Sequence, residues 1–171
     1  MNHYIIRQAL PKDLNTIMHL TETARLIMQQ NGNKTQWPQG TPSRACVEND
    51  LKQGDCFLVC TENGDAVGSF VLRQGPDPSY GNIYEGAWLD DKRPYHVIHR
   101  VTSIPEAHGI FSAIMDFCSS VSDNLRIDTH RNNTIMQHLV RKYGFNYCGI
   151  IHIANLENDY ERLAFQRLES K

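Results

Sequence analysis

The apolar positions in the first third of the chain predict one strand and two helices. Residues 4–8 are strand-like. Residues 11–30 predict a helix that a Pro-Lys-Asp segment opens and an Asn-Gly pair closes, and five apolar residues share one of its faces: Leu14, Ile17, Met18, Ala24 and Met28. A loop rich in turn residues then leads into a second predicted helix over residues 43–51.

The middle of the chain predicts a hairpin followed by a long loop. Residues 56–60 and 66–72 are apolar and strand-like, and Asn63-Gly64 between them is a dipeptide typical of a tight β-turn. The stretch 73–94 is rich in Pro and Gly and holds several aromatic residues. It predicts a long ordered loop, of the kind that often carries function.

Strand-like and helix-like segments alternate in the second half of the chain. Six segments follow one another as strand, helix, strand, helix, strand and strand: 96–103, 109–121, 125–129, 133–143, 146–154 and 160–166. This order predicts the α/β class, with a mixed sheet and helices on both faces. No repeat, low-complexity tract or linker interrupts the pattern, so we expect a single domain over residues 1–171.

The composition is that of an ordinary globular chain, and it narrows the range of partners. Of the 171 residues, 40% are hydrophobic and 21% are charged, and the formal net charge is -2. Because no basic patch stands out, we expect neither a nucleic acid nor a membrane as partner. We expect the cytoplasm as location, because the N-terminus lacks a signal-peptide pattern and the five cysteines show no Cys-x-x-Cys spacing.

The turn after the strand at 96–103 is suited to hold an anion. Ile104-Pro105-Glu106-Ala107-His108-Gly109 leads directly into the apolar pattern of the next helix. The first N–H groups of a helix have no partner inside the helix, and the helix dipole adds positive potential there. We therefore expect a phosphate group to bind at this helix start.

Four groups of residues, in this order and spacing, carry a resemblance to a known family. They are Ile6-Arg7-Gln8-Ala9 with Asp13-Leu14, Asp65-Ala66-Val67-Gly68, the turn that ends at Gly109, and Asn133 with Gly144-Phe145. Over nearly its whole length the chain resembles the GCN5-related N-acetyltransferase (GNAT) superfamily. The resemblance implies a mixed, mostly antiparallel sheet of about six to seven strands, flanked by about four helices. It also implies direct transfer of an acetyl group from acetyl-coenzyme A to a primary amine, in a ternary complex and without a metal.

Three positions depart from the family's pattern. Glu106 stands where the family usually has Gln or Arg, Phe111 where a small residue is usual, and Val140 where a general-acid Tyr is common. The family holds the pyrophosphate mainly through backbone N–H groups, for which side-chain identity matters less. The alternative interpretation of the chain is a non-catalytic acyl-coenzyme A binding or sensor domain.

The resemblance also implies which residues bind acetyl-coenzyme A. A backbone N–H of Val101 or Thr102 would stabilise the oxyanion that forms on the thioester carbon. The pyrophosphate would lie against the turn and the helix start, and Asn133 would contact the pantetheine arm while also capping its own helix. The implied binding residues are Val101, Thr102, Ser103, His108, Gly109, Ile110, Phe111, Ser112 and Asn133.

Acyl transfer to an amine needs a base, because a free alkyl amine has a pKa of about 10. His99 lies on the strand before the turn, and an imidazole exchanges protons near neutral pH. It resembles a histidine that arylalkylamine N-acetyltransferases carry on this strand, and a purely structural histidine is the alternative. Glu85 is a second candidate, for a relay through water, unless it is simply solvated. Tyr143 would either replace part of the missing acid or pack under its helix end.

The remaining expectations concern metal, acceptor and assembly. His96 and His99 are three residues apart on a strand, so they face opposite sides of the sheet and no metal site is expected. Trp37 and Trp88 lie in Pro-rich loops, where they would line an acceptor pocket or anchor the loops on the core. The acceptor is left open between a small amine and a protein N-terminus or lysine. Family practice indicates a homodimer.

Overall fold

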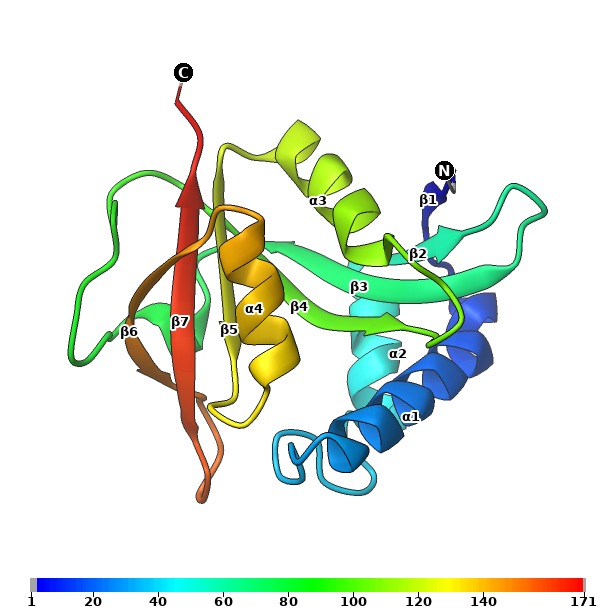
Figure 1. The fold of residues 1–171 in the computed structure, drawn as a ribbon, viewed down its shortest axis with the longest axis horizontal. Helices are drawn as coiled ribbons and strands as arrows, with labels where there is room; N and C mark the ends of the chain where they lie inside the picture. The colour runs from blue at the N-terminus through cyan, green and yellow to red at the C-terminus, as the bar shows by residue number, and fades with distance from the viewer. Residues whose placement is uncertain (1–2, 171) are drawn as a thin grey trace.

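The computed structural model describes residues 3–170, which form one open sheet with helices on both faces (Figure 1). Its strands are β1 Ile5–Gln8, β2 Cys56–Cys60, β3 Ala66–Gln74, β4 His96–Ser103, β5 Asn124–Thr129, β6 Asn146–His152 and β7 Glu161–Leu168. Its helices are α1 Leu14–Gln30, α2 Arg44–Gln53, α3 Ile110–Val121 and α4 Thr134–Lys142, with short 3-10 helices at Pro11–Asp13 and Pro78–Tyr80.

The predicted order of strands and helices is confirmed, and only the element ends differ. β3 continues to Gln74, because its last residues still pair with the start of β4. The long loop after β3 is less irregular than predicted. It contains the 3-10 helix Pro78–Tyr80, and Tyr84 forms an isolated bridge with Ile150. The mixed, mostly antiparallel sheet that the resemblance implies is also confirmed.

The strand order of the sheet is β1-β2-β3-β4-β5-β7-β6, and every neighbouring pair is antiparallel except β4 with β5. These two parallel strands pair only where they begin, His96 with Leu125 and Val97 with Arg126. Beyond Val97 they diverge, as Figure 1 shows. The sheet therefore opens into a wedge at its centre, and the β5-facing edge of β4 has no strand partner there.

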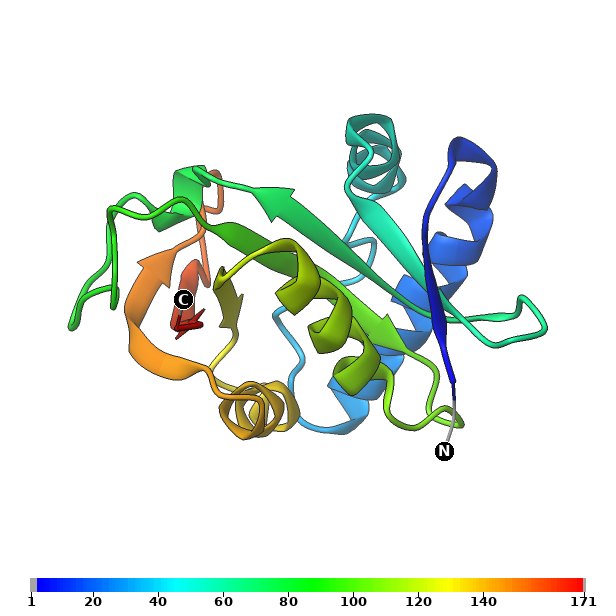
Figure 2. The ribbon, with the colours of Figure 1, turned by 90° about the horizontal axis from the view of Figure 1, so that it is seen from above.

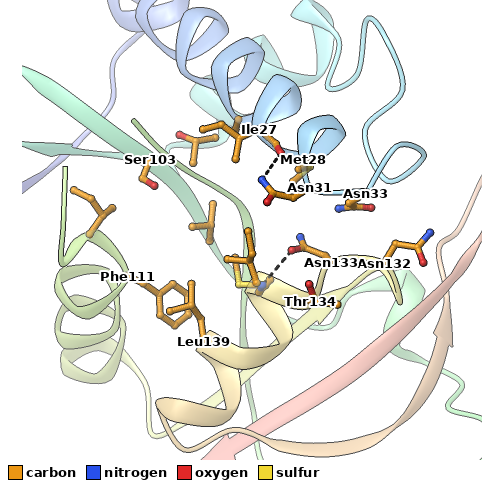
Figure 3. Close-up of a pocket in the computed structure, with 16 residues that line it drawn as sticks. Ile27, Met28, Asn31, Asn33, Ser103, Phe111, Asn132, Asn133, Thr134 and Leu139 are labelled. Carbon is orange, nitrogen blue, oxygen red and sulfur yellow. Dashed lines mark hydrogen bonds between the residues drawn. The ribbon is translucent and has the colours of Figure 1, made fainter. Parts of the chain in front are cut away.

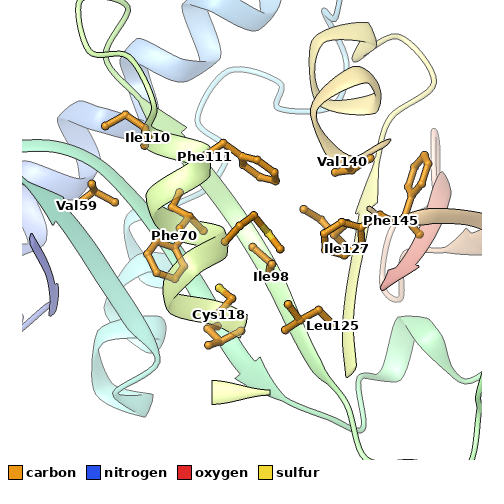
Figure 4. Packing of buried hydrophobic residues seen from close by; sticks show 14 of the residues in the cluster. Val59, Phe70, Ile98, Ile110, Phe111, Cys118, Leu125, Ile127, Val140 and Phe145 are labelled. Atoms are coloured by element: carbon orange, nitrogen blue, oxygen red, sulfur yellow. The ribbon is translucent and has the colours of Figure 1, made fainter. Parts of the chain in front are cut away.

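Helices cover both faces of the sheet (Figure 2), and each face buries its own apolar cluster. On one face, α3 and α4 pack on the central strands, and Phe111 of α3 and Val140 of α4 belong to one buried cluster (Figure 4). On the other face, Ile17 of α1 and Val47 of α2 belong to a second cluster with residues of β2 and β3. None of the helices within residues 3–170 combines the length and apolar character needed to cross a bilayer.

Gly68 of β3 explains how α3 comes so close to the sheet. A Cβ at this position would lie 2.7 Å from the backbone oxygen of Thr102 and 3.0 Å from Cγ2 of Ile110. Real Cβ atoms do not tolerate the shorter of these distances, so only glycine fits without a shift of the backbone. The glycine thus fixes the start of α3 against the end of β4, where the predicted anion site lies.

Candidate active site

Two cavities meet at the diverging part of β4. The smaller, of about 140 Å³, is a groove between the end of α1, the end of β4 and the starts of α3 and α4 (Figure 3). The larger, of about 650 Å³, lies on the sheet face that α1 and α2 cover. Four residues line both cavities: Met28, Val101, Asn133 and Met136. A ligand in the groove can therefore reach a second ligand in the larger cavity beside Val101.

A bulge in β4 shapes this meeting point. Ser69 of β3 lies opposite Thr102, but Val71 lies opposite His99, so β4 carries one extra residue between these pairs. Arg100 sits at the bulge with a φ of 52°, a left-handed conformation that non-glycine residues seldom adopt. Such strain persists only where the surroundings fix it.

An ionic network fixes the bulge from α2. Asp50, only 2% exposed, accepts two hydrogen bonds from Arg100, at 2.7 and 2.6 Å. It accepts a third from Arg73 of β3, at 2.9 Å, and Arg73 also pairs with Asp55. Burial disfavours the charge on Arg100, but the hydrogen bonds and charge of Asp50 outweigh burial and raise its pKa. The strained residue is therefore held in place by a carboxylate.

His99 faces the larger cavity and pairs with a carboxylate. Its Nε2 lies 2.9 Å from Oδ2 of Asp77, whose other carboxylate oxygen accepts a hydrogen bond from the Ser79 backbone N–H. Burial raises the pKa of Asp77, but the hydrogen bonds from His99 and Ser79 outweigh burial, so this pKa lies below its ordinary value. An ionised carboxylate only accepts, so in the neutral imidazole Nε2 carries the proton and Nδ1 keeps its lone pair. Within residues 3–170, Nδ1 has no hydrogen-bond partner.

In His130, unlike His99, both ring nitrogens have hydrogen-bond partners. Its Nδ1 accepts the backbone N–H of Asn132 at 3.0 Å, and its Nε2 lies 2.9 Å from both carboxylate oxygens of Asp159. Thr35 lies 3.3 Å from the same Nε2. Both ring nitrogens are engaged, so His130 ties three loops together and has no free lone pair for proton transfer. Of His99 and His130, only His99 lines a cavity and keeps a ring nitrogen free to accept a proton.

Tyr80 stands behind His99. Its ring centre lies 6.3 Å from that of His99, and its hydroxyl donates a 2.6 Å hydrogen bond to Oδ2 of Asp128 on β5. Burial, followed by the charge of Asp128, raises the pKa of Tyr80 well above its ordinary value. Tyr80 therefore stays a neutral donor that holds Asp128 at the cavity wall.

The turn before α3 has the features expected of an anion site. Gly109 has a φ of 79°, and no side chain caps the helix that follows it. The hydroxyl of Tyr4 donates a 2.6 Å hydrogen bond to the backbone oxygen of His108, which braces the turn from β1. Glu106 is exposed and lines a hollow on the side of the β2–β3 hairpin. Its carboxylate therefore does not line the groove.

The groove itself is mostly apolar at one end. Phe111 of α3 and Leu139 of α4 lie there, and asparagines gather at the other end (Figure 3). The ring of Phe111 packs edge-on against Tyr143, with centres 5.3 Å apart. Tyr143 lies under the end of α4 and lines neither cavity, and Val140 is fully buried. The proposed acid function of Tyr143 therefore gains no support from its position.

The cofactor-binding residues of the sequence analysis divide between the groove and the turn. Six of them line the groove, namely Val101, Thr102, Ser103, Ile110, Phe111 and Asn133. The other three, His108, Gly109 and Ser112, line a different surface hollow at the turn and the start of α3. Asn133 caps α4 as predicted, because its Oδ1 accepts the Met136 N–H at 3.1 Å. Its amide nitrogen also donates to Gln36, at 3.2 Å, so the loop after α1 is tied to α4.

The other predicted residues are dispersed. Trp37 lines the larger cavity. Trp88 instead stacks on Arg126, whose guanidinium carbon lies 3.9 Å from the Trp88 ring centre and 3.8 Å from that of Tyr95. Glu85 is exposed, has a φ of 55° and lines neither cavity. The structure thus brings His99 and Trp37 together, and leaves Trp88 and Glu85 outside the cavity.

The candidate metal ligands His96 and His99 lie apart. His96 faces a hollow beside Phe57 and Val121, on the opposite side of the sheet from His99. Within residues 3–170, no three or more His, Cys, Asp or Glu side chains are grouped so as to hold a metal ion.

Sequence reasoning missed three charged residues of the site, namely Asp50, Asp77 and Arg162. Asp77 caps the start of the 3-10 helix Pro78–Tyr80. The run Asp77-Pro78-Ser79 is typical of a helix start, so the sequence contained a local signal for an ordered carboxylate here. No local signal links it to His99, which lies 22 residues later. Asp50 reaches Arg100, and Arg162 reaches the cavity, only through the tertiary fold.

Comparison with known proteins identifies the fold. No protein-family model matches the sequence, and no curated protein matches it either. A GNAT-family acetyltransferase from Streptococcus agalactiae 2603 is 29% identical, with 98% of this chain and 96% of that chain covered and a TM-score of 0.85. A GNAT-family acetyltransferase from Listeria monocytogenes 4b F2365 is 19% identical, covering 97% and 95%, with a TM-score of 0.71.

A third similar structure is a complex with an acyl-coenzyme A. GphF, a GNAT-like decarboxylase in complex with isobutyryl-CoA, is 16% identical, covers 96% of this chain and 98% of that chain, and has a TM-score of 0.67. The likeness to these proteins extends over almost the full length of each chain. We conclude that this chain belongs to the GNAT superfamily.

Proposed function

We propose that this protein is an N-acetyltransferase that moves an acetyl group from acetyl-coenzyme A directly to a primary amine. Membership of the GNAT superfamily supports an acyltransferase that depends on an acyl-coenzyme A in general. The observation that carries the finer proposal is the position of His99. Its free Nδ1 and the ionised Asp77 behind it line a cavity that joins the groove at Val101.

The residues of the groove fit an acyl-coenzyme A. The start of α3 has no side-chain cap, so its first N–H groups are free to hold a pyrophosphate. The unpaired edge of β4 offers backbone groups to the amides of a pantetheine arm, and Phe111 and Leu139 offer it an apolar wall. When bound, acetyl-coenzyme A supplies the acetyl group as an activated thioester.

His99 supplies the proton transfer in this proposal. The reaction forms a C–N bond, breaks the C–S bond, and releases one proton from the amine. Nδ1 of His99 accepts that proton, either directly or through a water molecule, and Asp77 stabilises the resulting imidazolium. Because a thiol has a pKa of about 8.5, the thiolate leaves without a strong acid. Tyr143 and Glu85 are not needed.

The bulge in β4 orients the other catalytic group. Val101 follows the strained Arg100 and lines both cavities. A backbone N–H of Val101 or Thr102 would donate to the oxygen of the reacting carbonyl as negative charge develops on it. Such donors act best when they are fixed before the reaction, and the Asp50–Arg100 pair supplies that rigidity.

The dimensions of the larger cavity favour a small acceptor. A volume of about 650 Å³ is typical of pockets for small molecules. Loops after α1, β3 and β6 surround it, and Trp37 contributes an aromatic wall. A small-molecule amine is therefore the acceptor that we propose, ahead of a protein N-terminus or lysine.

Calorimetric titration with acetyl-coenzyme A, desulfo-coenzyme A and adenosine diphosphate tests the first half of the proposal. We expect acetyl-coenzyme A to bind in the micromolar range, because the groove and the α3 start together hold both ends of the ligand. Turnover of a panel of amines then tests the second half. Absence of any binding by acetyl-coenzyme A would overturn the proposal.

Two matched histidine variants test the base. His99→Gln should lower kcat by about 100-fold without weakening the binding of acetyl-coenzyme A. His96→Gln is the control, because His96 lies on the same strand but faces the other side of the sheet. Equal kcat in both variants would remove His99 from the mechanism. Tight binding without turnover of any amine would favour the sensor domain.

A further inference from the structure

Arg162 is a buried cation at the wall of the larger cavity. It is the second residue of β7, and it is only 6% exposed. Its Nη1 donates to the backbone oxygens of Asp159 and Glu161, at 2.6 and 2.8 Å. These two bonds fix the guanidinium group but use only one of its three nitrogens.

The rest of this guanidinium group has no partner. Within residues 3–170, Nε and Nη2 of Arg162 form no hydrogen bond, and no carboxylate oxygen lies within 4.0 Å of the group. Both nitrogens keep some solvent-accessible surface, and Arg162 lines the cavity. Burial lowers the pKa of Arg162, although Asp128 and Asp159 favour its charged form.

The other charged groups of the cavity already have hydrogen-bond partners. Arg73 and Arg100 share the carboxylate of Asp50. Asp77 is bonded to His99, and Asp128 accepts the hydroxyl of Tyr80, as described above. Arg162 is thus a charged group of the cavity whose free donors have no carboxylate oxygen within 4.0 Å among the described residues. A buried charge is costly to leave unpaired, so a ligand that brings an anion would be bound strongly.

We propose that the amine acceptor carries a carboxylate group, and that Arg162 binds it through Nε and Nη2. The inference rests on the proposed function, because it names the substrate class of the same cavity. A guanidinium group offers two parallel N–H donors that match the two oxygens of a carboxylate. His99 on β4 and Arg162 on β7 lie on either side of β5, so the acceptor reaches from one strand to the other with its amine at His99.

The substrate preference of the unaltered protein is the first test. A series of straight-chain amino acids, with the amine at one end and the carboxylate at the other, is assayed with acetyl-coenzyme A. The chain length increases along the series, and each acid is compared with the corresponding carboxamide. For the chain length that fits, we expect kcat/KM to be at least about tenfold higher for the acid than for the amide. Amides that serve as well as acids at every length would overturn the inference.

Variants of Arg162 assign the preference to this residue. Arg162→Gln should raise KM for the acid by about tenfold and leave kcat/KM for the amide nearly unchanged, so the preference disappears. Arg162→Lys should keep part of the preference for the acid over the amide. Arg131→Gln is the control, because Arg131 is exposed and pairs with Glu161 outside both cavities. Equal losses for acid and amide in Arg162→Gln would mean a structural role only.

A binding measurement separates failure of this inference from failure of the proposed function. The same acids and amides are titrated into the protein saturated with desulfo-coenzyme A, and again into the protein alone. Tighter binding of an acid than of its amide, lost in Arg162→Gln, would support the carboxylate site even if no amine is acetylated. If acetyl-coenzyme A binds and amines are acetylated, but no acid binds better than its amide, only the inference fails.

Discussion

Asp50 of α2 holds Arg100 of β4 by two hydrogen bonds, across 50 residues of sequence, at the one place where β4 adopts a left-handed conformation. The pair connects a helix on the sheet face to the backbone that borders both cavities. Without it, Arg100 would be free to relax toward an extended conformation, and the extra residue of the bulge would move. The conformation of Val101 therefore depends on a carboxylate that touches no ligand.

Asp50→Asn should lower stability and turnover together. Removing the charge leaves Arg100 without the one ionic partner that it has within residues 3–170, which costs about 3 kcal/mol for a buried pair. At a temperature where the variant stays folded, we expect kcat to fall by about tenfold, because the N–H donor beside the bulge loses its fixed position. Thermal melting and steady-state kinetics measure the two effects.

Asp55→Asn is the matched control for this prediction. It removes a partner of Arg73 but leaves the Asp50–Arg100 pair in place. We expect it to change kcat little at the same temperature. A similar loss of kcat in both variants would show that the network acts only through general stability.

Asp77→Asn should inactivate the protein while keeping its fold. The amide can present its NH2 group to Nε2 of His99, and then the ring proton moves to Nδ1, the nitrogen that must accept a proton. We expect kcat to fall by about 100-fold, with little change in the affinity for acetyl-coenzyme A. Steady-state kinetics and calorimetry together test this, and unchanged kcat would exclude Asp77 as the orienting group.

Gly109→Ala should weaken the binding of acetyl-coenzyme A. The φ of 79° costs an alanine about 1 kcal/mol, and relief of that strain would tilt the first N–H groups of α3. An affinity loss of about fivefold follows, to be measured by calorimetry. Gly64→Ala is the control, since Gly64 has a φ of 91° in the β2–β3 hairpin, lines neither cavity and also faces open space. Equal losses of affinity for acetyl-coenzyme A in the two variants would mean that Gly109→Ala acts through general stability and not at the binding site.

The sequence predicts those structural elements whose formation depends on residues close together in the chain. Asn63-Gly64 predicts the β2–β3 hairpin because the turn needs a positive φ, and Gly64 has one. The helical spacing of apolar residues predicts α3 because one face must be buried on the sheet. Asn133 predicts the start of α4 because its side chain caps the helix. Each of these signals lies within a few residues.

The site depends on contacts that no local pattern encodes. Nothing near Arg100 indicates a bulge, because a positive φ is unusual for arginine and is imposed by Asp50 from a distant helix. Trp88 is an aromatic residue of the kind that lines pockets, but its ring instead stacks on the guanidinium group of Arg126 on β5. Arg162 is one of many arginines in the sequence, and only the fold leaves its guanidinium group unpaired beside the cavity.

The Arg7–Asp13 pair, which belongs to the motif that first suggested the family, predicts an acid-sensitive link between β1 and α1. Asp13 accepts two hydrogen bonds from Arg7, each 2.9 Å long, and one from the Leu10 backbone N–H at 2.8 Å. The bond from Arg7 lowers the pKa of Asp13, although burial opposes it. Because the folded-state pKa lies below that of the unfolded chain, the link stabilises the fold above about pH 4 and is lost as the pH falls through the folded-state value.

Asp13→Asn should therefore reduce stability by about 2 kcal/mol at pH 7 and by progressively less as the solution is acidified. The sign follows from protonation: in strong acid the native Asp13 is neutral, and its advantage over asparagine is gone. Denaturant melts of both proteins at a series of pH values measure the difference. Asp65→Asn, at an exposed hairpin position, should show no such dependence. A difference between native protein and Asp13→Asn that stays constant down to strong acid would mean that shape, and not the charge on Asp13, joins β1 to α1.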